Sequence, residues 1–224
     1  IIMVIPLMHY LRTVSSSRWV RWALLASMLL SAMAVLGTYS RGGLLAVSAM
    51  LLFLWLRSRR KLLFALVIVP LIPVAIMLMP ERWGDRMDTI STYEQDGSAM
   101  ARINTWTMII NLAKDRPIVG GGFEHYSLRN SMRYSPTPNA VHAAHSVYFQ
   151  ILGEHGYVGL LIFLSIGIST WMVARRTIAA VRHRADMAWA GQLARAIQVS
   201  LVGYAVGGTF INIGYWDLIY YEVV

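Results

Sequence analysis

The sequence predicts an all-α fold: a polytopic bundle of transmembrane helices with one long loop that carries an amphipathic surface helix. Three observations predict this class. Hydrophobic residues make up 57% of the 224 residues. Charged residues make up only 14%, whereas soluble domains contain about 25%. The hydrophobic residues also occur in runs, and the basic residues cluster between those runs, as in polytopic membrane proteins.

The chain divides into three parts, residues 1–79, 80–146 and 147–224, and the first and last contain the apolar runs. The opening, IIMVIPLMHYL, is interpreted as the end of a membrane helix that begins earlier in a longer protein. A spanning helix needs about 20 residues. The fourth of the remaining runs is longer than this and the second is shorter, which predicts tilt or an interfacial extension. We expect these five helices at Trp19–Thr38, Gly42–Leu56, Leu62–Met79, Val147–Ala174 and Ala196–Trp216.

Charge predicts the orientation of this bundle. Three connections between apolar runs are rich in arginine, and the positive-inside rule assigns them to the cytoplasm. The turn at Tyr39–Arg41 and residues 80–146 then lie together on the opposite side of the membrane. The basic residues of the three connections are Arg12, Arg18 and Arg21, then Arg57, Arg59, Arg60 and Lys61, and finally Arg175, Arg176, Arg182, Arg184 and Arg195.

Residues 80–146 are too many for a passive connection, because loops beyond about 12–15 residues are usually functional or disordered. Within them, Ile103, Trp106, Ile110 and Ala113 share one helical face. This spacing predicts an amphipathic helix over about 98–114, lying on the outer membrane surface. The glycines of IVGGGF at 118–123 predict a flexible turn. Together, the helix and this turn suggest a movable cover over a site.

Composition excludes several classes of function. The chain contains no cysteine, which rules out disulfides, thiolate metal sites and cysteine nucleophiles. Its net charge of +9 lies in short clusters between apolar runs, the pattern of cytoplasmic loops, so we expect membrane lipids and no nucleic acid as partners. Phosphate-binding and dinucleotide-binding glycine motifs, a serine-hydrolase elbow and zinc-ligand spacing are all absent from the sequence.

Arg41 stands between two apolar runs in TYSRGGLLA. One interpretation is a side chain that reaches to the lipid headgroups. The other is an inward-facing arginine that binds an anion, since charged groups inside a bundle are costly and usually functional. A guanidinium matches phosphate oxygens with two parallel hydrogen bonds. Ser40 beside it is a candidate supporting residue.

Further arginines lie in the long loop. Arg102, in the first turn of the predicted surface helix, is either solvated or a second phosphate contact on the same side of the membrane as Arg41. Arg116, at the end of that helix, is a weaker candidate of the same kind.

His142 and His145 precede the apolar run at Val147 and share one helical face if a helix begins that early. Two histidines without a well-placed carboxylate are a weak metal signal, and no metal site is predicted. His145 is either an interfacial side chain or a general base, because an imidazole exchanges protons around neutral pH. His142 is a candidate supporting residue. Glu154, further along, is either a polar group packed against a neighbouring helix or a supporting site residue.

Four short motifs occur in a fixed order: SRGG at 40–43, RINTW at 102–106, DRPIVGGGF at 115–123 and HSVYFQILGEHGYVGL at 145–160. This ordered set resembles the O-antigen ligase and O-antigen polymerase superfamily. With ARAIQVSLVGYAVGGTF at 194–210, the chain resembles more closely the O-glycosylation ligases associated with the exosortase A system. The likeness covers nearly the whole chain. Members of the family have about twice as many membrane helices, so we expect this chain to be the C-terminal half of a longer protein.

The resemblance implies a multi-pass enzyme of the bacterial inner membrane that transfers a glycan at its periplasmic face. The donor is a polyprenyl-pyrophosphate-linked glycan, and the acceptor is a hydroxyl of a glycolipid or protein. By this resemblance, Arg41 and Arg102 contact the pyrophosphate and His145 is the base; no cofactor or metal is implied. Two alternatives stay open: a polymerase that joins lipid-linked glycans, and a transporter of such a glycan.

Overall fold

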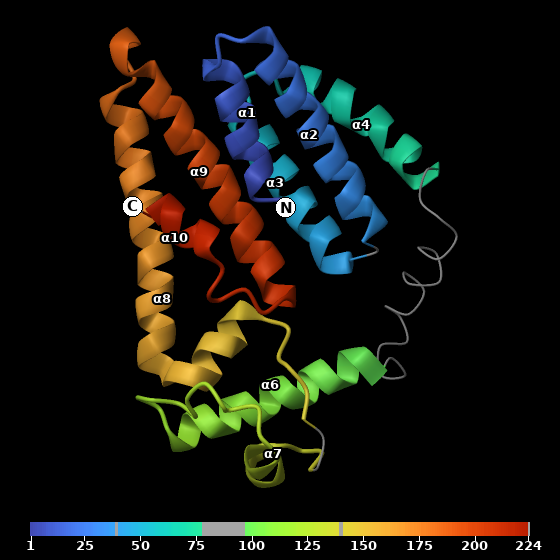
Figure 1. The fold of residues 1–224 in the computed structure, drawn as a ribbon, viewed down its shortest axis with the longest axis vertical. Coiled ribbons are helices and arrows are strands. Elements are labelled where there is room, and N and C mark those ends of the chain that lie inside the picture. Colours follow the sequence, from blue (N-terminus) through green and yellow to red (C-terminus); the bar gives the residue numbers. More distant parts are fainter. Residues whose placement is uncertain (39, 78–96, 139–140, 224) are drawn as a thin grey trace. The chain divides into compact units, whose positions relative to one another are not determined.

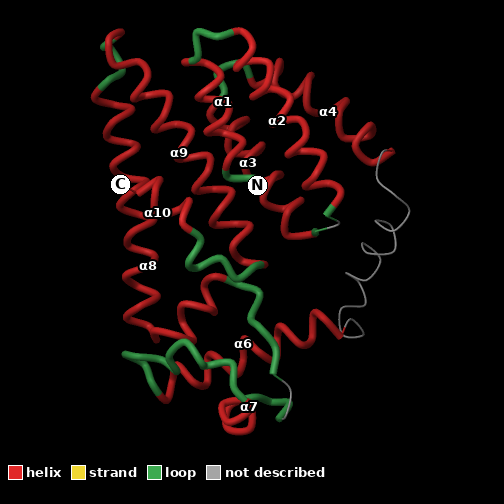
Figure 2. The backbone as a smooth tube through the Cα atoms, viewed as in Figure 1, coloured by secondary structure: helices red, strands yellow, loops and turns green. Residues whose placement is uncertain are grey.

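The computed structural model describes residues 1–38, 40–77, 97–138 and 141–223, and the regular structure within these ranges is entirely helical (Figure 2), which confirms the all-α prediction. The elements are α1 (Val4–Val14), α2 (Arg18–Gly37), α3 (Arg41–Arg57), α4 (Lys61–Met77), α6 (Gly97–Asp115), α7 (Leu128–Tyr134), α8 (Val147–Ala180), the short helix η2 (Ala185–Met187), α9 (Ala188–Gly207), η3 (Gly208–Phe210) and α10 (Asp217–Val223) (Figure 1).

These elements form two compact units. The bundle unit comprises α1 to α4, the C-terminal part of α8 and α9, within the described residues 1–38, 40–77 and 169–207. The loop unit comprises α6, α7, the N-terminal part of α8 and α10, within 97–138, 141–168 and 208–223. The domain limits expected from the sequence remain a prediction.

Small residues bring α3 and α9 of the bundle unit into close contact. A Cβ atom built at Gly203 would lie only 2.5 Å from Sδ of Met50. One built at Gly207 would lie 3.4 Å from Cβ of Ala46, a residue with no exposed surface. Glycine and alanine at spacings of four are the usual means by which membrane helices approach each other closely. The small residues that permit this contact are Gly203 and Gly207 in α9 and Ala46 in α3.

Polar contacts fix the direction of α1 and α3 relative to α9. Ser200 Oγ donates to the carbonyl of Met3 over 3.0 Å, and Thr13 Oγ1 donates to Gln192 Oε1 over 3.1 Å. Arg57 Nη1 donates to Oε1 of the buried Gln198 over 3.0 Å. The C-terminal ends of α1 and α3 therefore lie beside the N-terminal half of α9, as Figure 1 also shows. The three arginine-rich connections thus meet at one end of the bundle unit.

The first four predicted apolar runs correspond to α2, α3, α4 and α8, and the fifth differs from the prediction. Helix α9 spans Ala188–Gly207, so the predicted range Ala196–Trp216 was wrong at both ends, because the pair Gly207–Gly208 ends the helix and the chain turns. Among the described helices, α2 and α8 are long and apolar enough to cross a membrane. A bundle with more spanning helices stays a prediction.

In the loop unit, α6 spans Gly97–Asp115, close to the helix predicted over 98–114, but its buried side agrees only in part with the predicted face. Of that face, Ala113 is completely buried and Ile103 is 39% exposed, and the other buried residues of α6 are Thr105, Met108, Ile109 and Leu112. Apolar residues occur on both sides of this helix, so periodicity could not single out the side that packs. Met108 and Ile109 belong to a protein core, which gives the helix a packed side in addition to any membrane contact.

Helix α8 is broken at Gly156, whose backbone (φ 67°, ψ −166°) is not helical. Loop 117–122 satisfies the backbone groups freed by this break. The amide of Gly121 donates to the carbonyl of Gly153 over 2.7 Å, and the amide of Gly122 donates to the carbonyl of Glu154 over 3.0 Å. In return, the amide of Tyr157 donates to the carbonyl of Pro117 over 2.8 Å. The glycines predicted to form a flexible turn are instead docked against the broken helix.

Candidate functional site

His145 occupies a strained position immediately before α8. Its φ of 47° lies in the left-handed region, and among the described residues other than glycine only His145 has a positive φ. Side chains there cost about 1–2 kcal/mol, because Cβ approaches the following carbonyl oxygen. The side chain is exposed, although Ala144 and Ser146 on either side of it are completely buried. Such strain in a non-glycine residue is typical of functional positions.

Hydrogen bonds on both sides hold this strained backbone in place. Trp106 Nε1 donates to the carbonyl of Ala144 over 2.7 Å, and the amide of Ala144 donates to the hydroxyl of Tyr126 over 3.0 Å. The amide of Ser146 donates to Asn212 Oδ1 over 2.9 Å. The ring of Trp106 also stacks on Phe149, with 4.8 Å between ring centroids. The position of His145 is thus determined by three other segments of the loop unit.

Arg102 lies on α6 one helical turn before Trp106, so both residues occupy the same face of that helix. Its Nε atom is buried and has no hydrogen-bond partner among the described residues. A buried guanidinium donor without a partner is costly, and an anionic ligand would satisfy it. Because Trp106 contacts the residue before His145, the structure brings Arg102 and the His145 segment into the same part of the loop unit.

Arg41 is the first residue of α3 in the bundle unit, and Ser40 is the N-cap of that helix. The hydroxyl of Ser40 accepts a hydrogen bond from the amide of Gly43 over 3.1 Å. Ser40 therefore has a capping role, and Arg41 lies where helix amides and the helix dipole both favour an anion. Arg41 belongs to a different compact unit from Arg102 and His145. Their convergence stays a prediction.

Helical geometry does not bring two of the candidate residues, His142 and Arg116, close to His145. Residues 141–146 are not helical and α8 begins at Val147, so the condition under which His142 and His145 would share a helical face is not met. Arg116 is exposed beyond the end of α6, about 21 Å along the helix from Arg102 by the rise per residue. In the described residues, no group of three or more His, Cys, Asp or Glu side chains is placed to hold a metal ion.

Glu154 is 5% exposed and forms part of a polar chain that the sequence did not reveal. Its carboxylate accepts from the Tyr215 hydroxyl, and the same hydroxyl lies 2.8 Å from His155 Nε2. Gln150 Nε2 donates to Glu154 Oε1 over 3.4 Å. His155 and Tyr215 line a largely apolar cavity of about 490 Å³. Through these contacts Glu154 connects α8 to the segment that follows α9.

The segment 212–215 supports successive turns of α8. Asn212 accepts from the amide of Ser146, the amide of Gly214 donates to Gln150 Oε1 over 3.2 Å, and Tyr215 donates to Glu154. Ser146, Gln150 and Glu154 are spaced by four residues and so share one face. Sequence analysis missed these partners because they are more than 60 residues away along the chain. The same segment therefore supports both His145 and Glu154.

His125 is a second residue that sequence analysis missed. Its ring is completely buried, and Nδ1 donates to the carbonyl of Gly122 over 3.2 Å. Nε2 is buried with no hydrogen-bond partner in the described structure. Burial is the main cause that lowers the pKa of His125 to about 4, although the Gly122 hydrogen bond opposes it and the nearby His155 adds to it. The ring is therefore neutral at neutral pH and packs against Gly153.

A family model described as O-antigen ligase matches residues 26–164, which is more than half of the chain. The matched range contains Arg41, Arg102, His145 and Glu154, whereas Asn212 and Tyr215 lie beyond it. No curated protein matches the chain.

Proposed function

The chain belongs to the O-antigen ligase family, and from this premise we propose that it transfers a glycan from a polyprenyl-pyrophosphate carrier to an acceptor hydroxyl. The reaction takes place at the periplasmic face of the bacterial inner membrane, within a multi-pass bundle. Within the family, we propose that the chain is one of the O-glycosylation ligases associated with the exosortase A system, as the motifs around His145 and in α9 suggest.

The backbone of His145 carries this proposal. His145 lies in the left-handed region and is exposed between two buried neighbours, whose backbone groups are held by Trp106, Tyr126 and Asn212. The backbone at His145 is strained, and such strain is typical of groups positioned for catalysis. A neutral imidazole at this position is suited to accept a proton from an acceptor hydroxyl.

Arg102 and Arg41 supply the countercharge in this proposal. The buried, unpartnered Nε of Arg102 supports a ligand with anionic oxygens. Arg41 combines its own charge with the N-terminus of α3, where helix amides also favour an anion. Two guanidinium groups on one pyrophosphate would make a metal ion unnecessary for stabilising the leaving group.

The proposed step is a single displacement. His145 takes the proton of the acceptor hydroxyl while the hydroxyl oxygen forms a bond to the anomeric carbon of the glycan. The bond between that carbon and the pyrophosphate oxygen breaks, and its electron pair leaves with the lipid pyrophosphate. Arg41 and Arg102 stabilise the developing negative charge. Attack opposite the leaving group inverts the anomeric configuration.

Replacement of His145 by alanine tests the proposal. With a purified lipid-linked glycan and acceptor, His145→Ala should lose about 10²–10⁴-fold in turnover, which is the usual contribution of one general base. Donor binding should be retained, because the arginines are intact. His142→Ala, which removes a nearby exposed histidine with a supporting role only, should lose far less turnover and serves as the comparison. Wild-type turnover of His145→Ala would remove the base assignment.

The same assay identifies the acceptor. A ligase adds the glycan to a glycolipid or protein hydroxyl, and mass spectrometry then detects the mass of one glycan on that acceptor. If mass is gained only by a second lipid-linked glycan, the enzyme is a polymerase. If lipid-linked glycan moves across the membrane without a new glycosidic bond, the chain is a transporter.

A further inference from the structure

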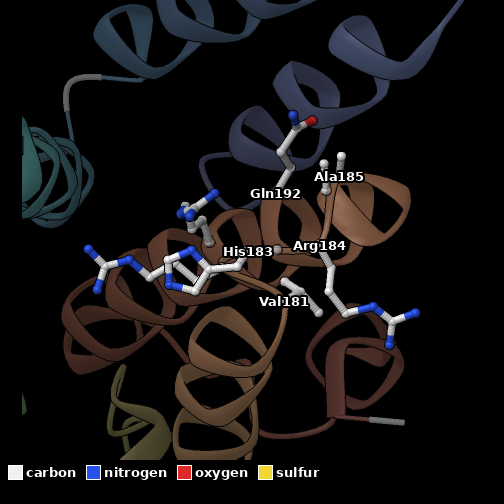
Figure 3. Close-up of a pocket in the computed structure, with 9 residues that line it drawn as sticks. Val181, His183, Arg184, Ala185 and Gln192 are labelled. Atoms are coloured by element: carbon white, nitrogen blue, oxygen red, sulfur yellow. The ribbon is translucent and has the colours of Figure 1, made fainter.

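The turn between α8 and α9 forms a basic pocket at the arginine-rich end of the bundle unit. The pocket has a volume of about 370 Å³, and its lining includes Arg182, His183, Arg184 and Arg195 (Figure 3). Figure 3 shows His183 and Arg184 extending in opposite directions from the turn. Arg184 Nη2 lies 2.7 Å from Asp186 Oδ2, so its charge is already offset. Arg182 and Arg195 supply the remaining permanent positive charge.

Acidic residues are scarce in this unit. Asp186 is the single aspartate or glutamate in its described residues, 1–38, 40–77 and 169–207. Arg12, in the last turn of α1, has a buried Nε without a hydrogen-bond partner within these same ranges. Next to it in sequence, Thr13 contacts Gln192 of α9. The arginine-rich end thus carries unbalanced positive charge close to the pocket.

A larger apolar cavity adjoins this basic pocket. It has a volume of about 720 Å³ and lies among α1, α2, α3 and α9. Residues of α9 that line it are spaced as one helical face, and two of them, Gln192 and Arg195, also line the basic pocket. The basic pocket and the apolar cavity therefore adjoin at Gln192 and Arg195.

The larger cavity changes in polarity along its length. Because α1 and α9 run antiparallel, His9 and Thr13 of α1 lie towards the end with Gln192 and Arg195, while Ile2 and Ile5 lie towards the opposite end with Val199. From Ile2 to Thr13 the helix rises about 17 Å, roughly half of a 30 Å hydrocarbon core. The cavity thus extends from a cationic end into an apolar interior over about one leaflet.

We propose that this pair of hollows binds one anionic phospholipid of the membrane. The phosphate headgroup lies in the basic pocket between Arg182 and Arg195, and one acyl chain fills the apolar cavity. Basic pockets between membrane helices are suited to anionic headgroups. A soluble anion would leave the apolar cavity empty, and a neutral lipid would leave the arginines without a counterion. The site is separate from the proposed glycan-transfer residues Arg41, Arg102 and His145.

Native mass spectrometry of the full-length protein tests this proposal. The protein is released from nanodiscs that contain either phosphatidylglycerol or phosphatidylethanolamine with identical acyl chains. We expect one tightly bound phosphatidylglycerol and at least about fivefold less in Arg195→Gln, given the usual contribution of one basic residue near an anionic lipid surface. Arg176→Gln is the matched control, because Arg176 carries the same charge near the end of α8 but does not line either hollow.

A second pair of variants tests the apolar part. Val47→Phe places a ring in the cavity and should reduce bound phosphatidylglycerol, whereas Leu45→Phe changes an exposed residue of the same helix and should not. Equal retention of both lipids would overturn the proposal. So would unchanged binding in Arg195→Gln, or inorganic phosphate that displaces the bound species completely. A full-length protein that retains no lipid would also overturn it.

Discussion

Strain at His145 has a cost in folding free energy that can be measured. Any side chain at this backbone conformation is penalised, and glycine is not. The hydrogen bonds that Trp106 donates to Ala144 and that Tyr126 and Asn212 accept from Ala144 and Ser146 hold the backbone in place whichever residue is present at position 145. Stability and activity should therefore change independently at this residue.

We predict that His145→Gly is about 1 kcal/mol more stable than His145→Ala. Both variants lose the imidazole and should be equally inactive, so the difference reports the relief of backbone strain less the greater conformational entropy that glycine loses on folding. Denaturant unfolding of the detergent-solubilised protein measures it. Equal stability of the two variants would mean that residue 145 does not adopt a left-handed conformation in the folded protein.

His125 predicts a pH dependence of stability. Its pKa is lowered to about 4 in the folded protein because the ring is buried, whereas an exposed histidine titrates near 6.5. Above about pH 6.5 the ring is neutral in both states, so it imposes no penalty. Between pH 6.5 and 4 the unfolded chain takes up a proton that the folded chain does not. Stability should therefore fall by up to about 3 kcal/mol over this interval.

The control for this effect is His125→Asn. Its amide can still donate to the carbonyl of Gly122 but does not titrate. The variant should lose less stability than the wild type between pH 6.5 and 4 in a thermal or denaturant titration. Identical pH profiles would show that His125 is solvated and not buried as the structure indicates.

At the scale of elements, the break in α8 depends on glycines from two segments. A Cβ atom at Gly120 would lie 2.7 Å from the carbonyl oxygen of Gly153, and one at Gly156 would lie 2.5 Å from that of Pro117. Gly122 has a positive φ as well, but a Cβ there would meet no atom within 4 Å. An alanine at either Gly120 or Gly122 would incur the penalty of the left-handed conformation, but only an alanine at Gly120 would also clash with the backbone.

We predict that Gly120→Ala destabilises the protein more than Gly122→Ala. The second change costs about 1–2 kcal/mol for the left-handed conformation alone. The first adds a backbone clash, which separates loop 117–122 from α8 and removes its hydrogen bonds to Gly153 and Glu154. Amide hydrogen exchange at Gly121 and Tyr157 should rise selectively in Gly120→Ala. Equal effects of both substitutions would argue against the docked loop.

Helix positions could be predicted from the sequence, while their breaks and partners could not. Apolar runs placed α2 and α3, and the spacing of apolar residues placed α6, to within a few residues. Gly156 gave no clear signal, because single glycines also occur in continuous membrane helices. The partners of Glu154 and Ser146 come from residues 212–215, and no local pattern reports a contact over that separation.

At the scale of the whole molecule, the predicted site residues are divided between the two compact units, and their convergence stays a prediction. Motif order identified Arg41, Arg102 and His145, and family membership supports glycan transfer as the chemistry. Within the bundle unit, the contacts of α9 bring the arginine-rich connections to one end, in agreement with the charge-based orientation. Sequence reasoning could not supply the backbone strain that singles out His145.

The central claim is that Arg41, Arg102 and His145 act on one lipid pyrophosphate. An experimental structure of the full-length protein with a non-hydrolysable polyprenyl-pyrophosphate glycan analogue tests it most directly. We predict guanidinium nitrogens of both arginines about 2.7–2.9 Å from pyrophosphate oxygens, with the His145 ring facing the anomeric carbon from the opposite side. A pyrophosphate bound without either arginine, or with His145 on the other side of the membrane, would contradict the account.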